Sequence, residues 1–120
     1  MEKIQSICLM CDVMRALAQM ERQLMRQCGL TLNEAMVMCC IAGDTVSASD
    51  VCAHTGLMSS HASKVIRSVE EKGYITRGFG RTDKRQMLFS LTAKGRKLIQ
   101  EMKENELDVP EVLKGVLSEA

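Results

Sequence analysis

Residues 76–98 read T-R-G-F-G-R-T-D-K-R-Q-M-L-F-S-L-T-A-K-G-R-K-L, and this stretch decides the fold. Two segments, 73–77 and 86–91, combine partly alternating apolar positions with strand-forming residues, which predicts a β-hairpin. The loop between them carries glycines and charged residues, namely Gly78, Gly80, Arg81, Asp83, Lys84 and Arg85. A loop of this kind can place guanidinium groups in a nucleic-acid groove, so we interpret the hairpin as a DNA-binding wing.

Positive charge is concentrated around this hairpin. Residues 54–97 contain ten Lys or Arg and three Asp or Glu, so this stretch carries +7 while the rest of the chain carries −6. The overall net charge of +1 hides this asymmetry. A local basic surface of this kind is typical of proteins that bind a phosphate backbone.

Two short helices are predicted before the hairpin. A capping box at residues 47–50 starts the first, and Gly56 interrupts it. Ser59 or Ser60 is expected to cap the second, which ends at Gly73. The expected core face of this second helix consists of Ala62, Val65, Ile66 and Val69. Two helices separated by a glycine turn indicate a helix-turn-helix.

The opposite face of the second helix is polar and basic. Its members are Ser59, Ser60, His61, Ser63, Lys64 and Arg67. On an isolated helix such a face is most often only solvated, but the neighbouring wing favours a recognition surface. The predicted DNA-binding set therefore consists of these six residues with Arg77, Arg81, Asp83, Lys84 and Arg85.

The flanking regions have the pattern of amphipathic helices. Apolar residues recur at three- and four-residue spacing over residues 3–28, and Gly29 follows as a stop signal. Thr92 is expected to cap a later helix, and a final short helix begins at Asp108 or Pro110. The apolar face of the first helix is longer than one small domain can cover, so we expect a homodimer.

The predicted fold class is therefore mainly α with a small β-hairpin wing (α+β), a winged helix-turn-helix with amino- and carboxyl-terminal dimerisation helices. We expect one domain over residues 1–120. Within it, residues 1–29 and 92–120 would form the dimerisation helices, and residues 30–91 the DNA-binding winged helix-turn-helix.

Four motifs together carry a family resemblance. They are Leu30-Thr31, Val69-Glu70-Glu71-Lys72-Gly73-Tyr74-Ile75, Asp83-Lys84-Arg85 and Leu91-Thr92-Ala93-Lys94-Gly95. In this order, over roughly residues 30–103, the chain resembles the MarR family of winged-helix transcriptional regulators. The resemblance implies a homodimeric, sequence-specific DNA-binding regulator, a repressor, with its recognition helix in the major groove. It also implies that Arg85 enters the minor groove while Asp83 orients it through an ion pair; the alternative is an ordinary exposed ion pair in a turn.

The resemblance further implies an effector, either a small molecule or an oxidant. The chain departs from the family in being short and in having only two Phe, one Tyr and no Trp to line an effector pocket. Cys8 and Cys11 have C-x-x-C spacing on one helix face and are candidates for redox sensing; the alternative is that they pack in a helix-helix interface. We expect the six cysteines to be reduced and to lie mostly in the core.

Several other classes are disfavoured. His54 and His61 are the only histidines and both fall in the helix-turn-helix, so no metal site and no cofactor are expected. The C-x-x-C lies inside a long helix with no preceding strand, which argues against a redox enzyme. No run approaches the roughly 20 apolar residues of a membrane span, and no signal peptide is evident, so we expect a cytoplasmic protein. The alternative function is a winged-helix module that binds a protein partner without selecting DNA.

Overall fold

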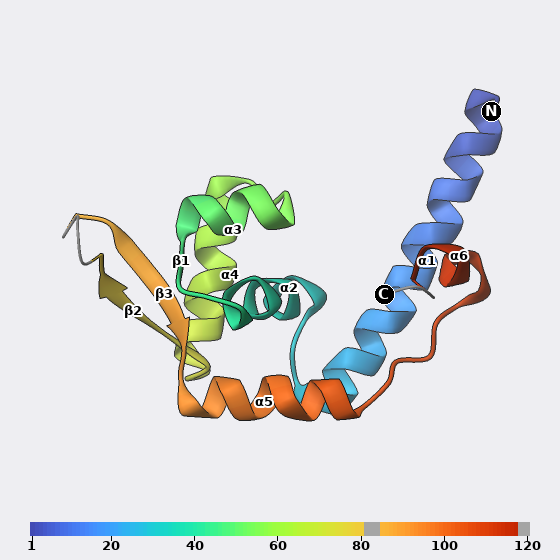
Figure 1. Cartoon of the computed structure of the whole chain (residues 1–120). Helices are drawn as coiled ribbons and strands as arrows, with labels where there is room; N and C mark the ends of the chain where they lie inside the picture. The colour runs from blue at the N-terminus through green and yellow to red at the C-terminus, as the bar shows by residue number, and fades with distance from the viewer. Residues whose placement is uncertain (81–84, 118–120) are drawn as a thin grey trace. The chain divides into compact units, whose positions relative to one another are not determined.

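The computed structural model describes residues 1–80 and 85–117. The chain divides into two compact units, one formed by residues 1–31 with 106–120 and the other by residues 32–105. The described residues are mostly helical, with one small three-stranded antiparallel sheet, which confirms the predicted fold class (Figure 1). Within that part of the chain, no helix is both long enough and apolar enough to cross a bilayer.

The first unit is built on a long amino-terminal helix, α1 (Lys3–Cys28), which ends at Gly29 in the left-handed region with φ 71°. A 3₁₀ turn, η1 (Glu111–Leu113), packs against α1 and continues into α6 (Lys114–Leu117). The Gln23 side chain donates to the Asp108 carbonyl at 2.9 Å and accepts from the Asp108 N–H at 2.8 Å. The carboxyl-terminal segment therefore packs against the first helix.

The second unit is the winged helix. Its elements are α2 (Leu32–Ala42), β1 (Val46–Ser47), α3 (Ala48–Thr55), α4 (Ser59–Glu71), β2 (Ile75–Phe79), β3 (Met87–Leu91) and α5 (Ala93–Glu104). Helices α2, α3 and α4 pack against one another around Val37, Met38, Val51 and Val69, which are fully buried. The hairpin of β2 and β3 extends beyond these helices (Figure 1). This arrangement confirms the predicted helix-turn-helix followed by a wing.

The sheet contains one strand that the sequence did not reveal. Its order is β1-β3-β2, and Phe89 of β3 lies opposite both Val46 of β1 and Arg77 of β2. No strand was predicted at Val46, because a strand of two residues is too short to show alternation. Burial of Ile75 and Phe89 anchors the inner half of the sheet to the helices.

The beginnings of α3 and α4 differ from each other. The predicted capping box of α3 is confirmed, since Ser47 Oγ accepts from the Asp50 N–H at 3.1 Å and Asp50 accepts from the Ser47 N–H at 2.9 Å. The predicted serine cap of α4 was wrong. This helix already includes Ser59, and Met58 holds the extended capping position without a side-chain hydrogen bond. A capping residue needs an extended backbone, which Met58 has, whereas Ser59 and Ser60 already lie inside the helix.

The six thiols are less buried than expected. Cys8, Cys11 and Cys39 are exposed, and Cys28, Cys40 and Cys52 are half-buried. The expectation of mostly core cysteines was therefore wrong for this chain. Successive residues of an α-helix point about 100° apart, so neighbours such as Cys39 and Cys40 cannot both face the core.

The base of the wing is closed by Thr92, directly before α5. Its hydroxyl donates to the Gly73 carbonyl at 2.7 Å and accepts from the Gly95 N–H at 3.0 Å. Its own N–H donates to the Tyr74 carbonyl at 3.0 Å. A Cβ on Gly95 would lie 2.0 Å from that carbonyl oxygen, so only glycine permits this contact. Helix α5 thereby belongs to the winged-helix unit, and any part it has in a dimer stays a prediction.

We expect Gly95→Ala to lower the free energy of unfolding by about 1–3 kcal/mol, because the added methyl group would collide with backbone. Urea denaturation followed by circular dichroism measures the change. Gly43→Ala is the matched control, since a Cβ there meets nothing within 4 Å. An equal loss in both variants would contradict a tight junction at Gly95.

Candidate DNA-binding surface

Helix α4 has two distinct faces. Its apolar residues Ala62, Val65, Ile66 and Val69 are all buried, as predicted. The six polar and basic residues of the other face are all exposed, namely Ser59, Ser60, His61, Ser63, Lys64 and Arg67. Among them the Ser63 hydroxyl donates to the Ser59 carbonyl at 3.0 Å. The structure therefore presents the predicted recognition residues together along one helix.

A buried carboxylate fixes the carboxyl-terminal half of α4 to α2. Glu34 of α2 is only 4% exposed and accepts hydrogen bonds from Ser68 Oγ at 2.6 Å and Lys72 Nζ at 2.8 Å. A charged group at such depth is stable only when it is paired and hydrogen-bonded. No local pattern in the sequence could show this role of Glu34, because its two partners lie more than thirty residues away along the chain.

A second carboxylate connects α4 to the wing. Glu70 Oε2 accepts from Arg77 Nε at 2.7 Å, and Glu70 Oε1 accepts from Arg77 Nη2 at 2.6 Å. These hydrogen bonds favour the charged forms of both groups, so they hold the pKa of the Glu70 carboxyl below its usual value and raise the pKa of Arg77. Arg77, predicted as a DNA contact, is thus hydrogen-bonded to Glu70 of the same chain.

The tip of the wing carries the remaining predicted residues. Arg85 is exposed, whereas Arg81, Asp83 and Lys84 lie outside the described residues. Gly80 N–H donates to the Gln86 carbonyl at 2.8 Å, where the described part of the hairpin ends. The structure therefore brings Arg85 onto the same hairpin as Arg77, and leaves the expected pairing of Asp83 with Arg85 a prediction.

The basic residue next to the wing base has an internal role. Lys94 Nζ donates to the Lys72 carbonyl at 2.7 Å and lies 4.8 Å from the centre of the Tyr74 ring. This contact covers the last turn of α4 with a cation, where a helix carries partial negative charge. Part of the positive charge counted in the sequence is therefore structural.

The other unit holds the cysteine pair. Cys8 and Cys11 are both exposed on α1, and Arg15 Nη1 lies 3.5 Å from the Cys11 sulfur. Both thiols are therefore accessible to solvent. Redox sensing by this pair stays a prediction.

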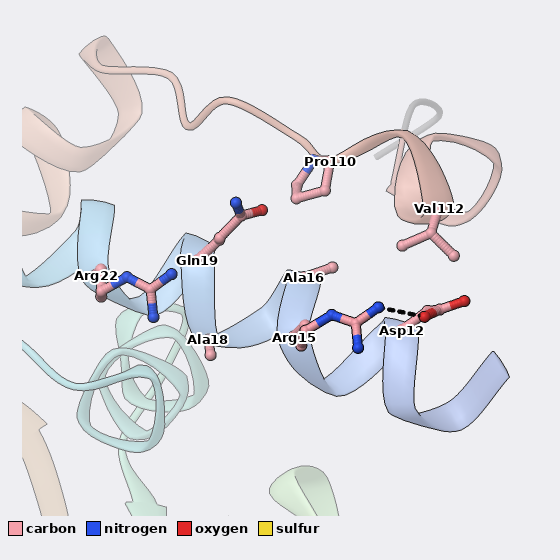
Figure 2. A pocket seen from close by; sticks show the side chains of 8 residues that line it. All are labelled: Asp12, Arg15, Ala16, Ala18, Gln19, Arg22, Pro110 and Val112. Carbon is pink, nitrogen blue, oxygen red and sulfur yellow. Dashed lines mark hydrogen bonds and ion pairs between the residues drawn. The ribbon is translucent and has the colours of Figure 1, made fainter. Parts of the chain in front are cut away.

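A surface groove of about 490 Å³ runs between α1 and the segment that contains Pro110 and Val112 (Figure 2). Arg15 and Arg22 line it from α1, and Arg15 is paired with Asp12 at 2.5 Å. Across residues 1–80 and 85–117, no group of three or more His, Cys, Asp or Glu side chains is arranged to hold a metal ion. Half of the residues that line the groove are polar or charged, and the other half are Ala16, Ala18, Pro110 and Val112.

The chain is similar in fold to several solved regulators. One is BpsR of Bordetella bronchiseptica, whose DNA binding is regulated by 6-hydroxynicotinic acid, with 23% identity, a TM-score of 0.73, and coverage of 82% of this chain and 71% of that one. Another is Sco3205 of Streptomyces coelicolor, a MarR family transcriptional regulator solved with DNA, with 17% identity, a TM-score of 0.78, and coverage of 86% and 69%. CouR of Rhodococcus jostii, bound to p-coumaroyl-CoA, has 21% identity, a TM-score of 0.75, and coverage of 98% and 81%.

No curated protein sequence matches the chain. A family model described as a winged helix DNA-binding domain matches residues 30–95, which is more than half of the chain. This region includes α2, α3, α4 and the described wing strands. The chain therefore belongs to the winged helix DNA-binding domain family, and its fold is that of MarR family transcriptional regulators.

Proposed function

We propose that this protein is a homodimeric, sequence-specific DNA-binding transcriptional regulator of MarR type. The observation that carries the proposal is the exposed polar face of α4 beside the basic wing, both supported by one packed unit. In this proposal α4 enters the major groove. Ser59, Ser60, His61 and Ser63 set the sequence preference, and Lys64 and Arg67 contact phosphates or guanine.

The wing is proposed to enter the minor groove through Arg85. A narrow minor groove concentrates negative potential, which attracts a guanidinium group. Arg81 and Lys84 would add phosphate contacts nearby, and Asp83 would orient Arg85 through an ion pair. A guanidinium held in this way loses less conformational entropy when it binds.

The proposal of a homodimer is supported by the apolar surface of α1. Ile4 is 67% exposed and Met14 is 70% exposed, and other large apolar side chains between them are also exposed. An apolar stripe of this length is unfavourable in water, and a second copy of the same helix can cover it. Two copies would present two recognition helices to half-sites about one helical turn apart.

Repression is the proposed outcome, because a dimer bound to promoter DNA prevents RNA polymerase from binding the same DNA.

A small-molecule effector is part of the proposal. The groove beside Pro110 would offer such a ligand the apolar side chains of Pro110 and Val112 and the guanidinium groups of Arg15 and Arg22 (Figure 2). An oxidant acting at Cys8 and Cys11 is the other form of control that the exposed thiols would permit. The cytoplasm is the compartment where such a regulator would meet DNA.

The test is selection of bound duplexes from a randomised pool, followed by fluorescence-anisotropy titration at about 50 and 200 mM salt, where phosphate contacts separate clearly. We expect an inverted repeat to be enriched, with an affinity that falls steeply with salt. If no sequence is enriched and binding is weak at both salts, the protein-interaction alternative is favoured.

We expect Arg85→Ala to weaken binding to the selected duplex by about 1–3 kcal/mol, because it removes the proposed minor-groove contact. Anisotropy titration measures the loss. Lys103→Ala is the control, since it removes a positive charge from the last turn of α5. If both variants bind equally well, Arg85 has no special part in recognition.

We expect Met14→Glu to convert the dimer to monomers, because it would place a charge in an apolar interface. Analytical ultracentrifugation measures the association, and Gln5→Glu adds the same charge at another exposed position of α1 as a control. The Met14 variant should retain weak binding to a single half-site and lose tight binding to the inverted repeat. An unchanged dimer would remove this face of α1 from the interface.

A further inference from the structure

Resting on the DNA-binding role proposed above, we propose that Glu70 and Arg77 form a wing clamp, and that Arg77 serves DNA binding through this clamp without touching the DNA. The clamp is the pair of side chains that ties α4 to β2. Its task is to hold the wing at a fixed angle to the recognition helix. Arg77 is then a positioning residue, unlike the exposed arginine at the wing tip.

The geometry of the guanidinium group supports this assignment. Two of its nitrogens bind the two carboxylate oxygens of Glu70 at 2.6 and 2.7 Å, which is the bidentate arrangement that fixes direction as well as distance. The third nitrogen lies 3.3 Å from the sulfur of Met87. The group also lies 5.6 Å from the centre of the Phe89 ring. All three nitrogens therefore contact the protein itself.

The position of Arg77 in the sheet explains how the clamp can restrain the wing. Arg77 is the middle residue of β2 and lies opposite Phe89, which also pairs with Val46 of β1. At this level all three strands are joined, while the pair Phe79 and Met87 lies farther out on the hairpin. A tie here restrains the outer half of the wing relative to α4.

The charges of the clamp argue against a direct phosphate contact. Glu70 neutralises Arg77, and both are partly exposed, at 24% and 46% of their side chains. A phosphate that approached Arg77 would therefore also meet the Glu70 carboxylate. The two roles predict opposite signs for Glu70→Gln. If Arg77 contacts phosphate, loss of Glu70 frees it and strengthens binding, whereas loss of the clamp weakens binding.

The experiment compares Glu70→Gln, Arg77→Gln and the double variant on the duplex selected by the wild-type protein. We expect each single variant to bind about fivefold more weakly, as a partly exposed ion pair allows, and the double variant to bind no more weakly than either. The slope of log affinity against log salt should not change. Arg77→Lys should stay weak, because an ammonium group cannot make the bidentate contact.

Glu71→Gln is the matched control. Glu71 is the exposed neighbour of Glu70, so its substitution removes the same charge from the same turn of α4 while leaving the clamp intact. We expect its affinity to equal or exceed that of the wild-type protein. The proposal is overturned if Glu70→Gln behaves in the same way while Arg77→Gln weakens binding and lowers the salt slope by about one.

A second measurement needs no DNA. Hydrogen exchange of the β2 and β3 amides should become faster in Glu70→Gln and Arg77→Gln, and should not change in Glu71→Gln, while thermal melting shows that all variants are folded. If the wild-type protein selects no duplex, the proposed function fails. Faster exchange in the two clamp variants alone would still support the clamp, and unchanged exchange would overturn it.

Discussion

The hydrogen bonds of Thr92 hold the two ends of the wing together, and the rest of the proposed surface depends on them. An isolated two-stranded hairpin is at best marginally stable in water. Here the residue that ends the hairpin also caps α5 and binds the backbone at Gly73 and Tyr74, where the hairpin begins. Because Gly95 has no side chain, α5 can approach the Tyr74 carbonyl closely enough for these bonds to form. One short motif thereby fixes the wing to the helical core.

Two ion pairs hold the recognition helix near its carboxyl-terminal end. Glu34 and Glu70 form their ion pairs with Lys72 and Arg77 around the carboxyl-terminal half of α4. The exposed polar residues of the recognition face instead lie from Ser59 to Arg67, before the residues of α4 that form these pairs. This separation keeps the side chains that would read DNA out of the ion pairs that position the helix. A mutation of a recognition side chain can therefore leave both ion pairs intact, and a mutation of an ion pair can leave the recognition side chains in place.

Local features of this protein were predictable from its sequence, and long-range polar contacts were not. The stop at Gly29 and the cap at Thr92 follow from chemistry within a few residues, and the buried face of α4 follows from its periodicity. The partners of Glu34 and the pairing of Val46 with Phe89 depend on how distant segments meet. Arg77 shows the consequence, because a count of charges in the sequence does not reveal that the fold pairs this arginine with Glu70.

The small number of aromatic side chains makes ion pairs important to the stiffness of the wing. The chain has only two Phe and one Tyr, and Phe79 lies exposed on the hairpin, so Phe89 is the one phenylalanine that packs the sheet onto the helices. Salt screens partly exposed charge pairs over a Debye length of about 10 Å at 0.1 M. The hydrogen bonds of the Glu70–Arg77 pair, at 2.6 and 2.7 Å, are much shorter than this length, so rising salt would weaken the proposed phosphate contacts far more than the pair. A steep loss of affinity with salt in this protein would then report the lost attraction to DNA, and variants that lack the pair should lose affinity by a similar factor at low and at high salt.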